Sequence, residues 1–586
     1  MNDIRRSILW VVFGFSMVLI WDKWQIHNGN KPTFFPSAAL TEQAAPGAVP
    51  PQADNSLPVA AAGAAASGDA AMAPTGSSAP TAQAVRTEVT TDVYKLTFNS
   101  DGGSLVGAQL TQHAADGHTR KELTEFPFTL LQQDDAHTYI AQTGLIGGAF
   151  PNHKTPMTLV PGPTALAEGQ DELQVKYESA EVGGVKLVKT YTLKRGSYDI
   201  AVQHAVVNSG AQPVSPQLYV QLVRDNKQTT NSTPFYSTFT GPAIYTAEQK
   251  YQKVEFKDID KQKAQAADPT GFKADYVRTA SEGYVAMVQH YFASAWVLGD
   301  GVPRNNFVRK IDNTLYAAGA ITELGEIAPG QSKTLDSRLF VGPQEEKVLE
   351  VITPGLELVK DYGWLTILAK PLYWLLEKIH GFVSNWGWSI VLLVVLIKAA
   401  FYWLNATAYR SMAKMKAINP RITEMRERLK SNPQAMQQEM MKIYREEKVN
   451  PLGGCLPIMI QIPVFIALYW VLLSSVEMRN APWVGWIHDL AQPDPFFILP
   501  LVMAVTTMIQ TALNPLPPDP LQAKLMWLMP LMFSVMFFFF PAGLVLYWIT
   551  NNILTILQQS YINNRMGVPL KITLPFDLFK SKPSAK

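Results

Sequence analysis

The sequence is poor in cysteine, and Cys455 is the one residue of this type among 586. A single cysteine cannot form an intrachain disulfide, and a metal site built on several cysteines is excluded as well. Cys455 follows two glycines at the start of an apolar run, and no histidine stands near it in the sequence. We therefore interpret it as a small buried hydrophobic residue rather than a catalytic thiol.

Charged residues are also scarce, at 17% of the chain against 47% hydrophobic residues, and the formal net charge is +2. A chain this close to neutral has no global basic field that would attract nucleic acid, and we expect no DNA partner. The hydrophobic residues are concentrated at the extreme N-terminus and in the last third, whereas the middle has the composition of a soluble domain. The length and this uneven distribution predict more than one folded unit.

The short motifs of common enzymes are absent too, since the sequence contains no HExxH, no GxSxG, no P-loop and no dinucleotide-binding fingerprint. One enzymatic alternative is a Ser–Lys dyad with Lys398 as the base. Ser389 would lie about 13 Å away along a shared helix and cannot reach it, whereas Ser534 on another segment leaves this alternative open. We expect no catalytic residues, no cofactor and no metal.

The N-terminal region contains an apolar run, residues 8–21, that follows Arg5 and Arg6. The run ends without a small-x-small cleavage site, which favours an uncleaved signal anchor over residues 1–24 rather than a cleaved signal peptide. The two arginines predict a cytoplasmic N-terminus. Residues 25–84 are rich in Ala, Pro, Gly and Ser, a composition that cannot bury a core and predicts a flexible linker.

Hydrophobic and polar residues alternate with a period of two across residues 85–345. The alternation is clearest at residues 94–98, 185–193 and 200–206, and turn signals rich in Gly, Asp and Asn separate such segments. Many short alternating segments at close spacing are typical of antiparallel sheets. We therefore expect residues 85–345 to form an all-β sandwich.

The last part of the chain has helical patterns. Residues 356–383 are amphipathic, rich in aromatic residues and too charged to cross a membrane, which predicts a helix lying on the membrane surface. Residues 386–565 contain five apolar runs, the last two divided by a Pro-Ala-Gly sequence at residue 541, and we expect a transmembrane helix in each. The expected spans are residues 387–406, 456–475, 496–513, 525–540 and 543–560. Together with the N-terminal anchor they make six transmembrane helices.

Basic residues predict the orientation of these helices. Residues 405–451 contain ten Lys or Arg against five Glu, and the tail after Tyr561 contains five Lys or Arg against one acid. The loop over residues 474–495 contains one Arg and three acids. Because basic loops stay in the cytoplasm, we place there both termini, a helical hairpin over residues 407–450 and a basic tail over residues 566–586. The β domain is then periplasmic.

Lys398 is the residue that most strongly indicates function. It lies about 15 Å along the helix from Trp388, and a charge at that depth is unfavourable by about 2.5–3.5 kcal/mol on insertion scales. The other spans contain no acid to pair with it, so it either extends to the cytoplasmic interface or faces a water-filled cavity. Polar residues that could line such a hydrophilic groove are Asn405, Gln461, Ser474, Thr507, Gln510, Asn551 and Asn552. Individually, each is also explained as a hydrogen bond between packed helices.

The predicted cytoplasmic hairpin carries six methionines between residues 412 and 441. A methionine-rich face can bind varied apolar partners, but methionine is equally suited to the seam between the two helices. The basic outer face could contact anionic lipid head groups or ribosomal RNA. The residues that we assign to such contacts are Met425, Arg426, Arg428, Met436 and Met440.

Several segments of residues 355–565 closely resemble the YidC/Oxa/Alb family of membrane insertases, most specifically the sequence Asn-Pro-Leu-Gly-Gly-Cys at residue 450. Similar matches occur at residues 386–390, 411–416, 425–429, 486–490 and 540–548. The anchor, the linker and the large periplasmic domain resemble the plan of Gram-negative members, in which that domain is a β-supersandwich.

The resemblance implies a function without covalent chemistry. Family members insert nascent inner-membrane proteins and help them to fold, alone or with the Sec translocon, through a cytoplasm-open groove with a cationic residue. The implied partners are nascent membrane proteins, the Sec translocon, the ribosome and signal recognition pathway, and the lipid bilayer. Two positions depart from the family pattern: the groove arginine is replaced by Lys398, and two adjacent tyrosines are replaced by Tyr547 and Trp548. A secondary transporter or an intramembrane peptidase that uses the same cavity is the alternative.

Overall fold

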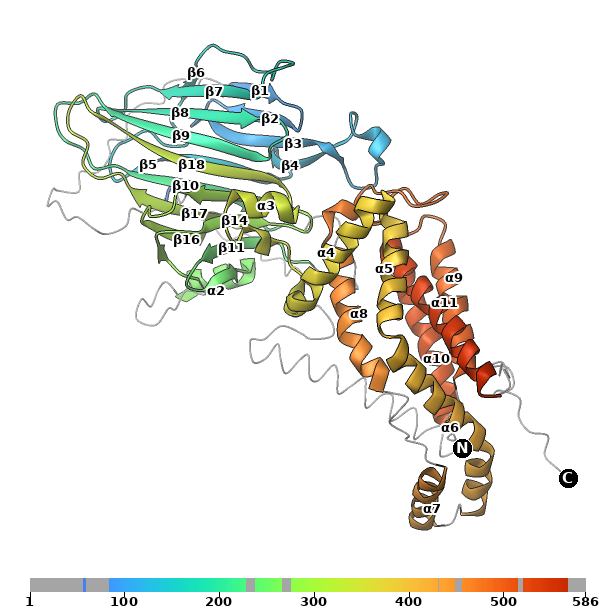
Figure 1. The fold of residues 1–586 in the computed structure, drawn as a ribbon. Coiled ribbons are helices and arrows are strands. Elements are labelled where there is room, and N and C mark those ends of the chain that lie inside the picture. Colours follow the sequence, from blue (N-terminus) through green and yellow to red (C-terminus); the bar gives the residue numbers. More distant parts are fainter. Residues whose placement is uncertain are drawn as a thin grey trace. The chain divides into compact units, whose positions relative to one another are not determined.

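The computed structural model describes residues 56–58, 84–227, 238–265, 276–429, 432–447, 456–514 and 520–567. It divides near residue 360 into a β-rich unit and a helical unit, which are described separately (Figure 1). The predicted anchor, nearly all of the predicted linker, Cys455 and the tail beyond residue 567 lie outside the described residues.

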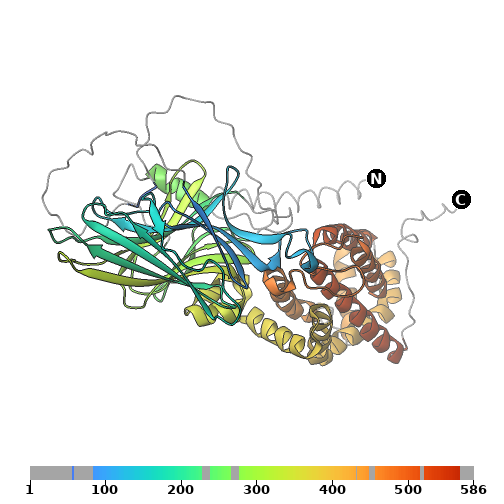
Figure 2. The same cartoon turned by 90° about the horizontal axis from the view of Figure 1, so that it is seen from above.

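The β-rich unit consists of two nine-stranded antiparallel sheets, and the predicted sandwich is thus confirmed (Figures 1 and 2). The first sheet has the order β1 (Arg86–Thr90), β2 (Tyr94–Asn99), β3 (Ser104–Ala114), β4 (Pro127–Gln133), β5 (Thr138–Ile146), β10 (Gln217–Asp225), β17 (Leu315–Glu323), β16 (Arg304–Lys310) and β13 (Thr279–Ala280). The second has the order β12 (Lys250–Lys253), β11 (Gly241–Thr246), β14 (Tyr284–Val288), β15 (Phe292–Leu298), β18 (Ser332–Pro343), β9 (Asp199–Asn208), β8 (Val185–Lys194), β7 (Glu172–Ser179) and β6 (Met157–Leu159).

The three segments with the clearest alternation form β2, β8 and β9. Along β8, side chains are alternately buried and partly exposed, as expected for a strand with one face on the core. Tyr139 on β5 joins the two sheets, because its hydroxyl bonds the Met287 carbonyl at 3.0 Å and Ser294 Oγ at 2.5 Å. Helix α2 (Phe256–Gln265) packs beside β16 and β17, with the Phe256 and Tyr316 rings 4.7 Å apart.

A lysine lies inside this sandwich. Lys189 on β8 is fully buried, and its Nζ atom donates to the carbonyl oxygens of Gly102 at 2.6 Å and Thr143 at 2.8 Å. Its cross-strand neighbour His204 is also fully buried, with Nε2 3.0 Å from Thr143 Oγ1. Burial lowers the pKa of Lys189 to about 7. Burial, with the nearby Lys189 charge, lowers the pKa of His204 to about 3.

The helical unit begins after the 3-10 turns η2 (Leu356–Val359) and η3 (Gly363–Leu365). Its helices are α4 (Thr366–Val383), α5 (Trp386–Ala400), α6 (Tyr402–Arg428), α7 (Pro433–Glu446), α8 (Leu456–Ser474), α9 (Ile498–Leu513), α10 (Pro520–Met536) and α11 (Ala542–Arg565). Helices α5 and α9 run parallel to α11, α8 runs antiparallel to it, and α10 runs antiparallel to α9, as contacts near the ends of these helices show. Helix α11 packs against both α5 and α9.

Two of the predicted helix boundaries are wrong. The helix expected over residues 356–383 begins only at Thr366, because Gly363 adopts a left-handed conformation with φ 67° and interrupts the helical path. The span expected over residues 387–406 is divided at Phe401, where α5 ends and α6 begins. Gln558 Nε2 donates to the Tyr402 carbonyl at 3.3 Å beside this break.

Helix length and apolarity bear on the predicted spans. Among the described residues no single helix combines the length and apolarity of a membrane span, whereas α5 and α6, bent by 69° at their break, meet both criteria when taken together. The number of six spans therefore stays a prediction. Helices α10 and α11 are also offset from the expected limits, since α10 begins at Pro520 and α11 continues to Arg565.

The buried lysine predicts a pH-dependent stability of the β-rich unit. Its pKa is about 7 in the folded chain and 10.5 when exposed, so the unfolded chain binds more protons between these values. The free energy of unfolding should then rise with pH across this window, by at most about 1.4 kcal/mol per pH unit. Urea unfolding at pH 7, 8 and 9 measures this slope, which Lys189→Met should flatten.

The matched control is Lys186→Met, on the same strand with a side chain 39% exposed, which should keep the slope. An unchanged slope in Lys189→Met would show that other groups cause the pH dependence.

Candidate functional site

Lys398 lies in the last turn of α5, just before the break at Phe401, and only 8% of it is exposed. Its Nζ atom donates a hydrogen bond to Thr555 Oγ1 on α11 at 2.9 Å. Thr555 donates its own proton to the carbonyl oxygen of Asn551 at 2.7 Å, so its oxygen accepts from the ammonium group. Within the described residues Lys398 forms no ion pair, and a neutral hydroxyl group binds the buried cation.

Helix α11 carries a buried polar face beside this lysine. Asn552, Thr555 and Gln559 recur at helical spacing and are all buried. Asn552 Nδ2 donates to Thr507 Oγ1 at 2.9 Å and to Thr506 Oγ1 at 3.3 Å, both on α9. Gln559 Nε2 donates to a backbone carbonyl at the end of α9 at 3.4 Å. One face of α11 therefore connects α5 and α9 through hydrogen bonds.

The other predicted groove residues are distributed differently. Asn405 is buried in the first turn of α6, and Asn551 is half-buried on α11 next to the lysine contact. Ser474 donates to a carbonyl of its own helix at 2.6 Å, and Gln510 is half-exposed on α9. The side chain of Gln461 lies outside the described residues. The structure thus joins Thr507 to Asn552 by a hydrogen bond, whereas Lys398 binds Thr555, whose hydroxyl donates to the backbone carbonyl of Asn551.

The two aromatic residues at the departure from the family pattern pack against α8. The ring of Phe465 lies 5.6 Å from that of Tyr547 and 4.4 Å from that of Trp548. Trp548 also lies 5.5 Å from Phe537, in the 3-10 turn η6 (Phe537–Phe539) that follows α10. Tyr547 is buried, whereas Trp548 is half-buried and retains an accessible surface.

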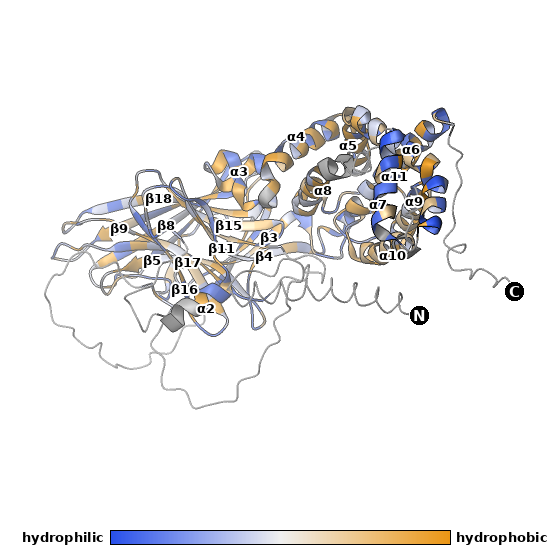
Figure 3. Cartoon of the chain, turned by 90° about the horizontal axis from the view of Figure 1, so that it is seen from below, coloured by the Kyte–Doolittle hydropathy of each residue, from blue (hydrophilic) through white to orange (hydrophobic). Residues whose placement is uncertain are grey.

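Helices α9 and α10 expose a broad apolar surface. Orange, hydrophobic residues follow α10 in Figure 3. The exposed hydrophobic residues of the two helices are Ile498, Leu501, Val502, Val505, Ile509, Leu528, Met529, Leu531, Met532, Phe533 and Val535. Exposed apolar side chains in this number on two neighbouring helices are unfavourable in water and are suited to lipid or to an apolar partner.

The hairpin of α6 and α7 has an apolar seam. Met425 is buried with Ile418, Ile422 and Ile443, and Met436 and Met440 are among the partly buried residues that pack against them. Three exposed ion pairs connect α6 with α7 and its C-cap: Arg428 with Glu439 at 3.3 Å, and Arg421 with Glu446 at 3.0 Å and Glu447 at 2.9 Å. The contact role that we assigned to Met425, Arg426, Arg428, Met436 and Met440 stays a prediction, and the structure places these methionines in the seam.

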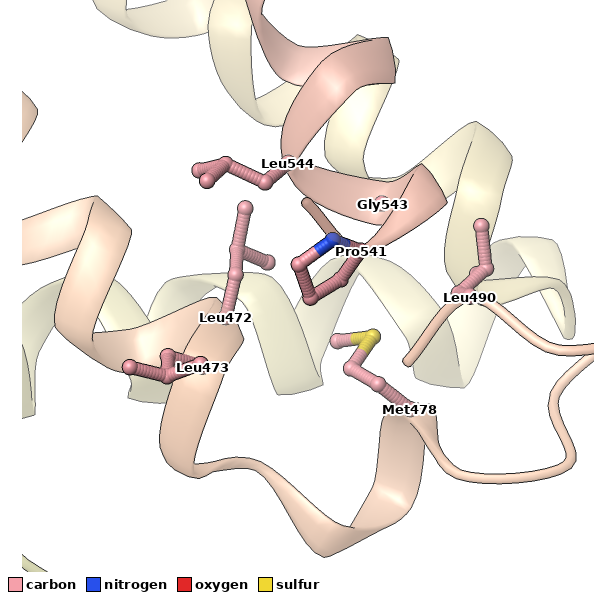
Figure 4. A pocket seen from close by; sticks show the side chains of 7 residues that line it. All are labelled: Leu472, Leu473, Met478, Leu490, Pro541, Gly543 and Leu544. Atoms are coloured by element: carbon pink, nitrogen blue, oxygen red, sulfur yellow. The ribbon is translucent and has the colours of Figure 1, made fainter. Parts of the chain in front are cut away.

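A small pocket lies where α8 ends and α11 begins (Figure 4). Its lining is apolar and contains none of the predicted groove residues. The lining residues are Leu472, Leu473, Met478, Leu490, Pro541, Gly543 and Leu544.

Thr555 and Gln559, which bind Lys398 and the end of α9 respectively, are not among the predicted groove residues. The signal was available, because Asn552, Thr555 and Gln559 follow the i, i+3, i+7 spacing of one helix face. The three residues are uncharged and are spread along an apolar run, so none of them marked this helix face as a site. For metals, the described residues contain no group of three or more His, Cys, Asp or Glu that could hold an ion.

The helical unit combines exposed apolar side chains on α9 and α10, a buried hydrogen-bonded cation and one bent helix pair with the length and apolarity of a span, and these features fit an integral membrane protein with an extramembrane domain. Two family models match the chain: the YidC periplasmic domain over residues 86–375 and the 60Kd inner membrane protein over residues 378–568.

Two relatives are named membrane protein insertase YidC. That of Cupriavidus necator is 55% identical over 567 residues, covering 96% of this chain and 98% of the relative. That of Cupriavidus metallidurans is 56% identical over 569 residues, with the same coverage. A solved structure of an active YidC insertase with its first transmembrane domain resolved has a TM-score of 0.36 and 18% identity, covering 81% of this chain and 93% of that chain.

The chain therefore belongs to the YidC family of membrane protein insertases. The family consists of inner-membrane proteins with a periplasmic domain, and its members are insertases rather than enzymes.

The contact between Lys398 and Thr555 predicts a matched pair of variants. Thr555→Val removes the acceptor of a buried charged donor and should lower the stability of the helical unit by about 1–3 kcal/mol. Thr555→Ser keeps the hydroxyl group and should lose well under half of that. Thermal unfolding in detergent measures both, and equal losses would contradict a hydrogen-bonding role for this hydroxyl.

Proposed function

We propose that Lys398 and its partner Thr555, together called the Lys398 cluster, bind the polar or acidic flank of a nascent membrane protein during its insertion. The observation that carries the proposal is the buried ammonium group of Lys398, which has a hydroxyl partner and no ion pair within the described residues. A carboxylate of the arriving chain supplies the missing anion, and attraction between opposite charges is strong in a partly dehydrated environment. Lysine attracts the carboxylate as a point charge, whereas arginine would also form a bidentate pair of hydrogen bonds with it.

The apolar segment of the arriving chain then lies along the exposed surface of α9 and α10, while its flank stays beside α11. Transfer of that segment from water into lipid supplies the driving force, so no nucleotide is needed. The membrane potential acts on charged flanks by about 2.3 kcal/mol per unit charge per 100 mV. Trp548, with its accessible ring, extends the apolar surface next to the cluster.

We also propose the topology of six spans, cytoplasmic termini and a periplasmic β domain. The alternating direction of α8, α9, α10 and α11 supports repeated crossing. Helix α4 supports a location at the membrane surface, since Ile367 is 88% exposed, Trp374 58% and Phe382 91%. The exposed Arg428 supports a cytoplasmic contact surface on the hairpin, for lipid head groups or the ribosome. The Sec translocon and the signal recognition pathway complete the proposed partners.

A peptidase that uses Lys398 as its base is less well supported. Ser534 donates to the carbonyl oxygen of Pro530 in its own helix at 2.8 Å, and Lys398 donates to Thr555. Each group of the supposed dyad therefore has another partner.

Replacing Lys398 tests the electrostatic role directly. Lys398→Met should reduce insertion of a substrate with an acidic flank by about tenfold or more, the equivalent of one charged hydrogen bond, whereas Lys398→Arg should retain it. A substrate with a neutral flank should be much less affected. The measurement is protease protection of the inserted substrate in vesicles that contain only the variant insertase.

Lys378→Met on α4 removes a lysine whose Nζ lies 5.9 Å from the Trp374 ring, away from the cluster, and serves as the matched control. Equal insertion of both substrates by wild type and Lys398→Met would exclude the electrostatic role.

Photocrosslinking tests the path of the substrate. A photoreactive residue at Trp548 or at Gln510 should crosslink ribosome-arrested chains that expose one apolar segment. The same residue at Val351, which is 83% exposed in the β-rich unit, should not. Crosslinks at Val351 alone would move the substrate path away from the helical core.

A further inference from the structure

The outer face of the first sheet is covered along β10, one of its interior strands. Tyr139 faces the second sheet and pairs with Arg224, so Arg224 and every second residue of β10 point inward. Tyr219, Gln221 and Val223 therefore point outward, yet they are at most 4% exposed. The outer face of a two-layer sandwich is ordinarily open to solvent. Something must cover it here.

Part of this cover is a short segment of the predicted linker, Ser56, Leu57 and Pro58. Arg309 donates from Nη1 to the Leu57 carbonyl at 2.7 Å and from Nη2 to the Ser56 carbonyl at 2.8 Å. Gln221 Nε2 approaches the same Ser56 carbonyl at 3.4 Å. Pro58 is buried against the unit. The backbone of this segment is thus bound through its carbonyl groups by two residues of the sheet.

The side chain of Leu57 has an apolar cradle. It packs against a cluster formed by Ile146, Tyr219 and Ile321, together with the half-buried Phe307. These four residues come from β5, β10, β17 and β16, so the cradle spans four neighbouring strands. Leu57 is the only leucine in residues 41–84, a stretch otherwise dominated by Ala, Pro, Gly and Ser. The cradle therefore binds the side chain of the only leucine in this stretch.

The polar groups of this surface are held in place by the sheet. Gln221 donates to Gln142 Oε1 of the neighbouring strand at 2.9 Å and accepts from Arg309 Nη2 at 3.3 Å. Gly319 is opposite both Gln221 and Phe307, and a Cβ atom there would lie 2.6 Å from the Phe307 ring. The missing side chain makes room for that ring, over which the Arg309 guanidinium lies at 5.5 Å.

We propose that this surface is a peptide-binding site for a short segment with a leucine followed by proline, and that its resident ligand is Ser56-Leu57-Pro58 of the same chain. We call this contact the linker latch. Proline restricts its own φ, which reduces the conformational entropy that the segment loses on binding. The latch divides the linker, so residues 25–55 alone determine the separation between the N-terminal segment and the β-rich unit. Their maximum reach is about 100 Å, against about 200 Å for residues 25–84.

Cysteine labelling in the full-length chain tests the latch. In a Cys455→Ser background, Ser56→Cys should react with a maleimide about tenfold more slowly than Val85→Cys, at a position that is 64% exposed. Loss of a charged hydrogen bond should remove most of this difference. Arg309→Gln provides that loss. Leu57→Ser should have the same effect, and because it lies outside the sheets it leaves the folding of the β-rich unit unaffected.

The matched control is Arg195→Gln, which removes an arginine of the same unit that also donates to backbone carbonyls, those of Ala167 and Gln170. This variant should leave the labelling of Ser56→Cys slow. Equal labelling rates at the two positions in the otherwise unchanged chain would overturn the latch. A slow rate at Ser56→Cys that persists in both Arg309→Gln and Leu57→Ser would overturn it as well.

Discussion

The burial of the Lys398 ammonium group is the constraint on which the helical unit depends. A cation among apolar helices must be hydrogen-bonded, and Thr555 provides the acceptor at 2.9 Å. The same face of α11 also presents Asn552 and Gln559, whose amide groups bind α9. One polar face of one helix thus positions two neighbouring helices and leaves the opposite faces of α9 and α10 apolar and exposed.

The β-rich unit also contains a buried lysine, but its hydrogen-bond acceptors are of a different kind. Lys189 is held by two backbone carbonyls inside a closed sandwich, and a backbone carbonyl cannot turn away without disturbing the sheet. Lys398 is held by a neutral side-chain hydroxyl, which can rotate away and leave the ammonium group to an anion. Burial is nearly the same for the two residues, at 0% and 8% exposure, but only the second is suited to an exchange of partners.

Much of the architecture was predictable from the sequence, and the remainder depended on contacts between distant residues. The period of two predicted the sandwich, because one face of most strands is buried against the other sheet. The break at Phe401 could not be predicted, since the apolar run continues across it and the bond from Gln558 comes from another helix. Lys398 was identified because a charge in an apolar run is conspicuous, whereas Thr555 is not. The contact between Arg309 and Leu57 joins the sheet to a stretch whose composition predicts no structure.

The break between α5 and α6 also has a mechanical consequence. Helix α6 continues for 27 residues from Tyr402 to Arg428, a length of about 40 Å. The helix begins at a bend within one turn of Lys398. A displacement of the far end of α6, where α7 packs against it, would therefore be transmitted along one helix to the neighbourhood of the buried cation.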